Sequence, residues 1–511
     1  MSALYAGLDV GTTGAKALLV DERGTLLASA TEEYPTHTPR PLWSEQDPED
    51  WWTAAVRAFG RLFHECGRKP EEVKGVGLTG QMHGLVLLDR RGGVLRPCIM
   101  WNDQRTAPQC EELTSKLGFD RLLELTGNPA LPGFTAPKIL WVRQNEPHVF
   151  ERTAHILLPK DYIRYRLTGE FATEVSDAAG TLLLDVRRRS WSPEMLRTLE
   201  IRGEWLPGMH ESPDVSARVS THAARETGFI GGTPVVGGGG DQAAGAVGSG
   251  VVREGVVSVT VGTSGVVFAH SDAYRIEPRG RLHAFCHAVP GAWHLMGVTL
   301  AAGGSLRWYR DTLGESDSAR AKERGMDPYE VLTEGAGKVP PGSEGLLFLP
   351  YLSGERTPYP DPNARGAFVG LTIRHTRAHM TRAVLEGVAF SLRDCLELMK
   401  NLKLDIREVR VSGGGARSTV WRQIMADVFN VELVTVTSTE GAPFGAALLA
   451  AVGAGHFKTV YEACDAMVKR VAVMPPQRKS VPVYEQLYQS YRELYPSLKG
   501  VFSRLTQTAL M

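Results

Sequence analysis

One pattern occurs twice in this sequence, the second time at roughly half the chain length. An apolar strand runs into a short loop of glycines and hydroxyl residues, and a second apolar strand follows. The first copy is LYAGLDV, GTTG and AKALLV, and the second is GVVSVTVGTSGVVFAH, Gly255 to His270. A chain of 511 residues is too long for one growing hydrophobic core, so two domains of roughly 250 residues are expected. Repeat and length together predict two related halves, each opening its own domain.

Both halves alternate strands and helices in the manner of an α/β fold. The apolar segments VKGVGLTG and DIREVRVSGGG end in glycines, and amphipathic segments such as STVWRQIMADVFN and FGAALLAAVGAG occur in the second half. In open α/β sheets, ligands bind at the loops that leave the strand ends, so chemistry is expected at these glycine-rich exits. The segment VYEQLYQSYRELYPSLKGVF near the C-terminus has aromatic residues at helical spacing, and we expect it to pack in a core without a chemical role.

The composition argues against several functional classes. Hydrophobic residues make up 43% and charged residues 22% of the chain, and the formal net charge is zero. A neutral chain gives no electrostatic basis for binding nucleic acid or an anionic membrane surface, so a small or neutral substrate fits better. The six cysteines lie far apart without a CxxC pair, which predicts free, mostly buried thiols. The start MSALYAGLDVGTTGAK lacks a secretory pattern, so we expect a cytoplasmic protein.

Three glycine-rich loops have the composition needed to hold phosphate oxygens. The first contains Thr12 and Thr13 and is followed by Lys16, and the second runs from Gly262 to Gly265 as GTSG. Each offers backbone N–H groups and hydroxyls at a tight turn, and neither matches the GxxxxGK[ST] pattern of a Walker A loop. A third segment, Ser412 to Ala416, ends a strand and opens a helix, where a flat ring or a phosphate could bind. Such loops in both halves predict a nucleotide in a cleft between the domains.

Asp241 follows four consecutive glycines in GGGGDQAAGA and precedes small residues that can open a helix. Such a run weakens regular structure, and close approach of a ligand to the backbone is the usual reason for it. A flexible turn with Asp241 as a helix N-cap is the alternative. Phosphoryl transfer needs a base for the attacking hydroxyl and a group that holds a divalent cation. We assign the base to Asp241, and the magnesium site to Asp9, acting through water.

Two further segments combine hydrogen-bonding side chains with an apolar surface. One follows the apolar strand VKGVGLT as QMHG, and the other follows LRPCIM as WNDQR. A sugar needs directed partners for its hydroxyls and packs its C–H face on an aromatic ring or a methionine. The candidates for acceptor recognition are therefore Gln81, Met82, His83, Trp101, Asn102 and Asp103.

The order of these motifs resembles that of the FGGY family of carbohydrate kinases. Both signature regions of the family are present, as GFTAPKILWVRQN from Gly133 to Asn145 and GAFVGLTIRHTRAHMTRAVLE from Gly366 to Glu386. Further segments that resemble the family follow in the expected order, among them LDVGTTGAK, GQMHG, WNDQRT, LLPKDYIRYRLTGE, SDAAGTLLLDV, GGGGDQAAGA, VGTSG, PYLSGERTP and GGGARSTVWRQIMAD. The resemblance covers essentially the whole catalytic body, and only the C-terminal segment matches loosely.

The resemblance implies an α/β fold of two actin-like, or ribonuclease H-like, domains around a catalytic cleft that closes during turnover. The expected N-terminal domain, residues 1–248, holds the sugar site, the first phosphate loop and the catalytic aspartate. The expected C-terminal domain, residues 249–511, holds the second phosphate loop and the adenosine site, and its last helix can pack back. By resemblance, Asp241 takes the proton from the 5-hydroxyl of the sugar and Asp9 lies near magnesium. The residues expected to contact ATP are Thr12, Thr13, Lys16, Gly262, Thr263, Ser264, Gly414, Gly415 and Ser418.

By resemblance, the activity is ATP-dependent phosphorylation of D-xylulose to D-xylulose 5-phosphate, in D-xylose catabolism that feeds the pentose phosphate pathway. The alternatives are a kinase for another ketose or polyol, such as ribulose, glycerol or fuculose, and an actin-like protein that binds nucleotide without transferring phosphate. Gln242 is expected in the sugar site but departs from the pattern, since family members that act on D-xylulose carry asparagine there. The expected partners are the sugar and ATP with Mg²⁺, without nucleic acid or membrane, and a homodimer is left open.

Overall fold

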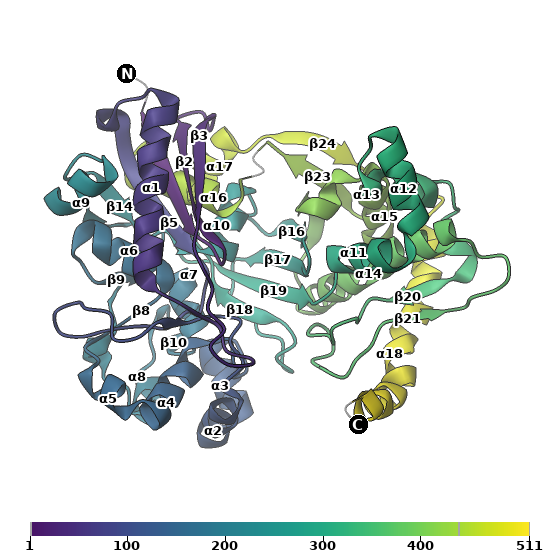
Figure 1. Cartoon of the computed structure of the whole chain (residues 1–511), viewed down its shortest axis with the longest axis horizontal. Coiled ribbons are helices and arrows are strands. Elements are labelled where there is room, and N and C mark those ends of the chain that lie inside the picture. The colour runs from purple at the N-terminus through teal and green to yellow at the C-terminus, as the bar shows by residue number, and fades with distance from the viewer. Residues whose placement is uncertain (1–2, 438–439, 510–511) are drawn as a thin grey trace.

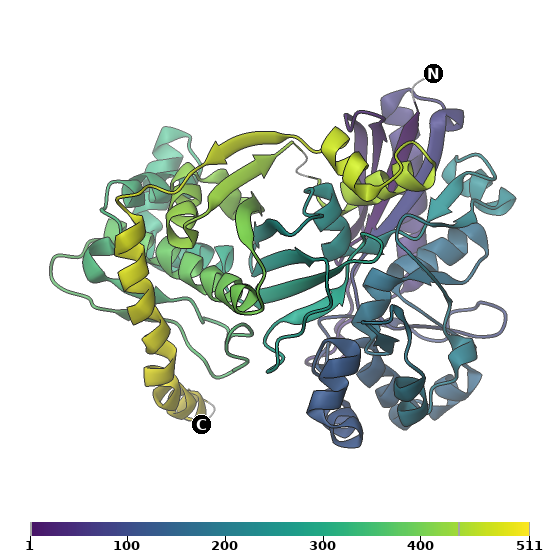
Figure 2. The same cartoon turned by 180° about the vertical axis from the view of Figure 1, so that it is seen from behind.

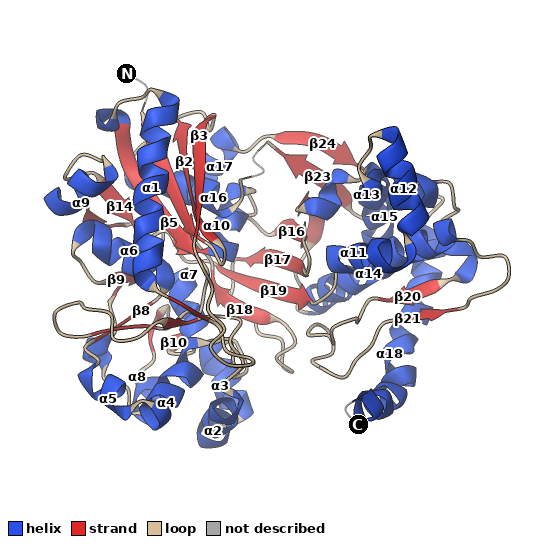
Figure 3. Cartoon of the chain, in the orientation of Figure 1, coloured by secondary structure: helices blue, strands red, loops and turns tan. Residues whose placement is uncertain are grey.

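The computed structural model describes residues 3–437 and 440–509 of the chain. Two seven-stranded sheets, one in each half, lie side by side (Figure 1). Figure 3 shows both sheets flanked by helices. The repeated sequence pattern forms two hairpins, β1 (Leu4–Val10) with β2 (Gly14–Asp21) and β16 (Gly255–Val261) with β17 (Gly265–Ser271). Each half is therefore built on its own copy of the repeat, as predicted.

Five strands have the same order and directions in the two sheets. In each sheet, the first three strands are joined by antiparallel pairs, and the last two are added by parallel pairs. The first order is β3 (Leu26–Glu33), β2, β1, β5 (Val73–Gly80) and β14 (Pro234–Val236), and the second is β19 (Trp293–Thr299), β17, β16, β22 (Ile406–Ser412) and β23 (Glu432–Val436). The remaining sheet strands are β13 (Val215–Arg218), β15 (Gly239–Gly240), β18 (His283–Cys286) and β24 (Arg470–Met474). The shared topology extends the repeat beyond the two hairpins.

Helix α1 (Pro48–Cys66) packs on the first sheet, and local sequence sets its two ends. The Asp47 side chain accepts a hydrogen bond from a backbone N–H of the first turn, and Pro48 occupies the first helical position, where its missing N–H costs nothing. Gly67 ends the helix with a φ of 61°, a left-handed conformation that glycine adopts without steric penalty. The apolar face between these ends buries Trp51 and Phe59 in the first core.

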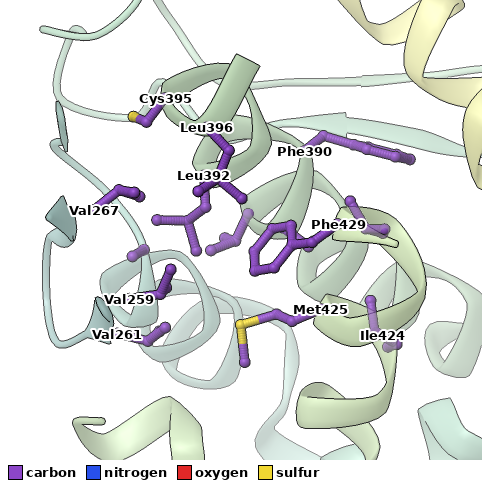
Figure 4. Close-up of a cluster of buried hydrophobic side chains, with 14 of the residues drawn as sticks. Val259, Val261, Val267, Phe390, Leu392, Cys395, Leu396, Ile424, Met425 and Phe429 are labelled. Atoms are coloured by element: carbon purple, nitrogen blue, oxygen red, sulfur yellow. The ribbon is translucent and has the colours of Figure 1, made fainter. Parts of the chain in front are cut away.

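The core of the second half lies between the second sheet and helices α14 (Arg377–Asn401) and α15 (Thr419–Phe429). In Figure 4, the side chains of Val259, Val261 and Val267 from the sheet lie opposite those of Leu392 and Met425 from the two helices. Helix α18 (Val481–Ala509) adds four buried tyrosines to this core, Tyr484, Tyr488, Tyr491 and Tyr495. The core role predicted for the C-terminal aromatic segment is therefore confirmed.

Helices α10 (Asp241–Gly248) and α16 (Ala442–Gly453) cross in direct backbone contact. A Cβ atom on Gly445 would lie 1.8 Å from the carbonyl oxygen of Ala244, so a larger residue cannot occupy this crossing without displacement. Helix α16 also packs on the first sheet, where a Cβ on Gly77 would lie 1.9 Å from the carbonyl oxygen of Ala446. Figure 2 shows this yellow-green segment beside the purple strands of the other half. The second half of the sequence thus contributes a helix to the first sheet, and the expected division at residue 248 stays a prediction.

A group of short elements extends from the first sheet, mostly in the lower left of Figure 1, and supports one wall of the site described below. Its helices are α2 (Ala107–Leu117), α3 (Phe119–Thr126), α4 (Thr135–Asn145), α5 (Pro147–Arg152), α6 (Pro159–Thr168), α7 (Val175–Ala178), α8 (Pro193–Leu199) and α9 (Thr221–Thr227). Its strands are β4 (Glu45–Gln46), β6 (Val86–Leu88), β7 (Cys98–Ile99), β8 (His155–Leu157), β9 (Ala172–Glu174), β10 (Leu184–Asp185), β11 (Ser190–Trp191) and β12 (Gly208–His210). The second half adds α11 (Gly303–Leu313), α12 (Glu315–Arg324), α13 (Pro328–Gly337), β20 (Leu347–Leu349), β21 (Ala367–Val369) and α17 (Val460–Met467).

Two expectations based on composition can be compared with the structure. All six cysteines are free and five are buried, with Cys66 partly exposed, so the prediction of free, mostly buried thiols is confirmed. Within residues 3–437 and 440–509, none of the helices combines the length and the apolar character that a membrane span requires.

The crossing of α10 and α16 makes Gly445→Ala destabilising. We expect this change to lower the free energy of unfolding by at least about 2 kcal/mol, because the added methyl group overpacks two backbones that already touch. The matched control is Gly60→Ala in α1, where an added Cβ meets nothing within 4 Å and the helix gains propensity. Urea unfolding of both variants and the wild type provides the measurement. Equal midpoints for Gly445→Ala and the wild type would contradict the described contact.

Candidate active site

Two cavities meet at the glycine-rich segment from Gly413 to Ser418. The larger, about 650 Å³, is lined by Asp9, Asp241, Gln242 and the Ser412 to Gly414 turn, with further residues of α10, β16 and β22. The smaller, about 440 Å³, is lined by Gly262, Thr263, Gly415, Ser418, Tyr329 and Trp421, among others. Gly414 and Arg417 line both cavities, so the two form a continuous path. The path has the size and shape for a nucleotide whose polyphosphate end points towards the two carboxylates.

Asp241 is the first residue of α10, is half-buried and lines the larger cavity. The preceding glycines are buried and tightly packed: Gly238 has a φ of 74°, and a Cβ on Gly240 would lie 2.9 Å from Cγ of Met82. The run is therefore a packed turn that brings the carboxylate beside the Met82 loop, and the alternative of a flexible turn is not what the structure shows. Burial raises the pKa of Asp241 to about 6, and the N–H of Gln242 donates to its Oδ1 at 2.7 Å.

Asp9 lies at the end of β1 and lines the same cavity. Burial, followed by the negative charge of Asp241, raises the pKa of Asp9 to about 7. Its Oδ1 atom is buried and has no hydrogen-bond partner in the described chain. An orphaned carboxylate oxygen beside a second carboxylate fits a Mg²⁺ ion, which takes oxygen ligands and keeps much of its water. The described residues contain no cluster of three metal-binding side chains, so waters and phosphate oxygens would supply the other ligands.

The two predicted phosphate loops are built alike. The N–H of Gly11 donates to the Gly14 carbonyl at 3.1 Å, and the N–H of Gly262 donates to the Ser264 carbonyl at 3.0 Å. Thr13, Thr263 and Ser264 are exposed, while Thr12 is half-buried and its hydroxyl accepts a hydrogen bond from Trp101 Nε1 at 3.0 Å. Gly262 and Thr263 line the smaller cavity, whereas Thr12 and Thr13 line neither cavity, so contact of the first loop with phosphate stays a prediction.

Lys16 forms an ion pair that the sequence did not predict. Its Nζ atom lies 2.5 Å from Oε2 of Glu440, which precedes α16. The ion pair joins β2 of the first half to the segment that carries α16 across the cleft. In this conformation Lys16 ties the two halves together, and its predicted contact with phosphate stays a prediction.

The loop of Gln81, Met82 and His83 forms a rigid wall beside Asp241. His83 has a φ of 70°, which is unusual for a residue with a side chain and marks a conformation held by its surroundings. Its Nδ1–H donates to the Gly180 carbonyl at 2.7 Å, and burial lowers the pKa of the ring to about 3, so the imidazole is neutral. The Gln81 side chain is buried and donates to Gln46 at 3.1 Å. Within the described chain, Gln81 Oε1 has no hydrogen-bond partner, and the His83 ring has its Nε2 atom left for a ligand.

Lys138 and Thr135 hold the His83 backbone, a role that motif reading missed. Lys138 Nζ donates to the His83 carbonyl at 2.8 Å and to the Gly133 carbonyl at 2.7 Å, and the Thr135 hydroxyl donates to the His83 carbonyl at 3.1 Å. The Lys138 side chain is fully buried, and this burial lowers its pKa to about 7. Both residues lie in the GFTAPKILW segment, where an isolated lysine among apolar residues was the available signal.

The second predicted acceptor segment divides into an exposed and a buried part. Trp101 and Asn102 are exposed, and the Trp101 ring reaches the first phosphate loop at Thr12. Asp103 is fully buried, and its carboxylate accepts hydrogen bonds from the Ser44 N–H and from the Arg105 guanidinium. The structure thus gives Asp103 an anchoring role in its own loop, and direct contact of its carboxylate with a sugar stays a prediction.

A buried cluster of charged side chains is linked to the glycine turn that precedes Asp241. Lys160 lies 2.7 Å from Asp161, 3.1 Å from Asp177 and 3.5 Å from Glu174, and all four side chains are excluded from solvent. The Ser176 hydroxyl donates to Glu174 at 2.9 Å and accepts from the Gly240 N–H at 3.1 Å. The cluster is thereby linked to the residue that precedes Asp241. Spacing alone did not reveal it, because its members come from α6, β9 and α7.

The comparisons with known proteins fit this geometry. The sequence model described as "FGGY family of carbohydrate kinases, N-terminal domain" matches residues 4–248, and the model of the C-terminal domain matches residues 257–454. The chain therefore belongs to the FGGY family of carbohydrate kinases. The resemblance found in the sequence is confirmed, and so is a carbohydrate kinase as the class of enzyme.

The chain is similar to two xylulose kinases and to a gluconokinase over nearly its whole length. A xylulose kinase of Bacillus subtilis (strain 168) is 39% identical over 499 residues, which cover 98% of this chain and 98% of that protein. The crystal structure of xylulose kinase from Rhodospirillum rubrum has a TM-score of 0.91 at 32% identity and covers 98% of this chain and 100% of that chain. A gluconokinase of B. subtilis (strain 168) is 31% identical over 507 residues, 99% of this chain and 98% of that protein. The two-domain actin-like fold is thereby confirmed.

Lys138→Met tests the support of the loop from Gln81 to His83, where the sequence predicts sugar binding. We expect the KM for the sugar to rise at least about tenfold, because the strained His83 backbone loses one of two donors, worth about 1–2 kcal/mol. The KM for ATP should stay within about twofold, since Lys138 lies away from the nucleotide path. Lys116→Met is the control, because Lys116 is exposed on α2 and pairs only with Glu112. Initial rates with each substrate varied give the result, and equal rises in both KM values would contradict the role.

The raised pKa of Asp241 predicts the pH dependence of turnover. The sequence predicts that Asp241 is the base, which must be unprotonated, and a carboxylate with a pKa of about 6 is ionised above pH 6 and protonated below it. We therefore expect kcat/KM for the sugar to fall about tenfold per pH unit below pH 6 and to recover fully on return to pH 7.5. Initial rates between pH 4.5 and 8 provide the measurement. A flat profile down to pH 4.5 would contradict the assignment.

Proposed function

We propose that this protein transfers the γ-phosphoryl group of ATP to the 5-hydroxyl of D-xylulose, releasing ADP and D-xylulose 5-phosphate. The observation that carries the proposal is the position of Asp241: a half-buried carboxylate at a helix start that lines the larger cavity and follows Gly240, which packs on Met82. Similarity to xylulose kinases over nearly the whole chain supports D-xylulose as the acceptor.

In the proposed reaction, Asp241 Oδ accepts the proton of the 5-hydroxyl as that oxygen attacks the γ-phosphorus. The bond between the γ-phosphorus and the β–γ bridging oxygen breaks, and ADP leaves with the electron pair. A pKa of about 6 keeps Asp241 largely ionised at neutral pH and still basic enough to hold the proton. Magnesium at Asp9 would neutralise charge on the β- and γ-phosphate oxygens. The glycine packing contributes by fixing the position of the carboxylate before the substrates arrive.

The nucleotide is proposed to lie along the two cavities. Gly414, Gly415 and Ser418 line the smaller cavity, where the rings of Tyr329 and Trp421 offer apolar walls for adenosine. Gly262 to Ser264 and Thr12 to Thr13 would then face the phosphate chain with backbone N–H groups. Arg417 borders both cavities and makes no ion pair in the described chain, so it is a candidate to neutralise the phosphates.

The alternative acceptors are another ketose or polyol, such as ribulose, glycerol or fuculose, and gluconate, on which the 31% identical relative acts by name. Gln242 lines the cavity next to the base and is the residue most able to shift the preference. A non-catalytic nucleotide-binding role is disfavoured by the position of Asp241, a half-buried carboxylate that the packed glycine turn holds against the larger cavity. We further propose a cytoplasmic enzyme of D-xylose catabolism that supplies the pentose phosphate pathway, whether or not it forms a homodimer.

A coupled ADP-release assay tests the acceptor. MgATP is combined with D-xylulose, D-ribulose, L-ribulose, glycerol, L-fuculose, D-gluconate or no sugar. We expect D-xylulose to give the highest kcat/KM, by at least about tenfold. Preference for another acceptor would overturn the substrate but keep the kinase, and absence of sugar-dependent turnover would overturn both.

Asp241→Ala tests the base. We expect kcat to fall by at least about a thousandfold while the fold persists, since a general base and its positioning role together contribute that much. The control is Asp120→Ala, an exposed aspartate in the first turn of α3. A variant that keeps more than a tenth of the wild-type rate would refute the assignment.

A further inference from the structure

A third cavity, of about 280 Å³, lies in the second half, apart from the nucleotide path. It is enclosed by α12, α13 and the first turn of α14. Four cationic side chains line it, Arg320, Arg324, Lys338 and Arg377, together with two carboxylates, Asp317 and Glu334. Four positive and two negative side chains leave a net charge of +2. We call this cavity, with its six charged side chains, the basic hollow.

The arginines of the basic hollow leave their donor capacity unused. Arg320 and Arg377 lie 3.8 Å and 3.9 Å from Asp317, and Arg324 lies 3.7 Å from Glu334, all beyond hydrogen-bond distance. Within the described residues, none of these three guanidinium groups donates a hydrogen bond. Arginines elsewhere on the surface pair closely, for example Arg121 with Glu194 at 2.5 Å and Arg253 with Asp465 at 2.7 Å. Lys338 donates to Glu334 at 2.7 Å, so the three half-exposed arginines are the cations of the hollow that make no hydrogen bond to a described residue.

We propose that the basic hollow binds a small anion with two or more phosphate groups. Guanidinium groups match phosphate oxygens with paired N–H donors, and three of them converge on one concave space from two helices. The two carboxylates of the hollow repel any anion. An anion with several negative charges is attracted more strongly by the net charge of +2 than a singly charged one. A pyrophosphate group fits easily within about 280 Å³. Nothing in the proposed kinase reaction requires this site.

The basic hollow is separate from the nucleotide path but shares a helix with it. Glu330 and Thr333 on one face of α13 line the smaller cavity of the active site, while Glu334 and Gly335 line the basic hollow. The two cavities have no lining residue in common. An anion in the hollow would therefore lie against the other face of a helix that forms the nucleotide wall, and a nucleotide would not displace it.

Calorimetric titration of the full chain with inorganic pyrophosphate tests the proposal. ADP is added at the lowest concentration that saturates the nucleotide path, because ADP also carries two phosphate groups, and magnesium is left out so that free pyrophosphate is the titrant. The double variant R320Q/R377Q removes two cations of the hollow. The matched control R121Q/R253Q removes the same charge from paired surface arginines elsewhere. Circular dichroism confirms that all variants are folded, and the titration does not depend on kinase activity.

We expect one pyrophosphate site in the wild type and the control, a dissociation constant at least tenfold higher in R320Q/R377Q, and weaker binding as KCl rises. Inorganic phosphate should bind far more weakly than pyrophosphate. The proposal is overturned if the wild type shows no site in the presence of ADP. It is also overturned if R320Q/R377Q binds as the wild type does, or if the control loses binding equally, which would mark a non-specific effect of net charge.

Discussion

The backbone contact between α10 and α16 is the constraint on which the rest of the structure depends. Two helices can touch at this distance only where side chains are missing, and Gly445 supplies that absence at the carbonyl of Ala244. The same helix α16 rests on the first sheet at Gly77. Because the contact with α16 fixes α10, the first residue of α10, Asp241, projects into the space between the halves. The position of the Asp241 carboxylate is thus a result of backbone packing.

Two carboxylates repel each other in the site, and a bound cation would reduce this repulsion. Asp9 and Asp241 face one cavity, and burial together with mutual repulsion raises the pKa of Asp9 to about 7. The nearby Lys16 is engaged with Glu440, so the protein itself neutralises this pair only partly. A divalent cation and the phosphates it carries would complete the charge balance. The buried cluster around Lys160 also places three carboxylates around one ammonium group, and Ser176 links it by hydrogen bonds to Gly240, the residue before Asp241.

The sequence revealed the features that depend on local chemistry. The two glycine loops, Asp241 and the third turn at Ser412 were visible because glycine, hydroxyl and carboxylate residues fall at strand ends. What it could not reveal depends on contacts between distant segments. The support of His83 by Lys138, the anchoring of Asp103 by the Ser44 N–H and the placement of α16 on the first sheet each join residues that no spacing rule connects. Burial decides their roles, and burial is a property of the folded chain.

The most direct test of the account is a crystal structure of the Asp241→Asn variant with MgATP and D-xylulose. The change removes the base but keeps its size, so both substrates should remain bound. The account predicts the 5-hydroxyl within about 3.5 Å of the γ-phosphorus, next to residue 241, with adenosine beside Gly415 and Ser418. A sugar bound away from the Met82 to His83 wall, or a γ-phosphate that does not reach the larger cavity, would contradict it.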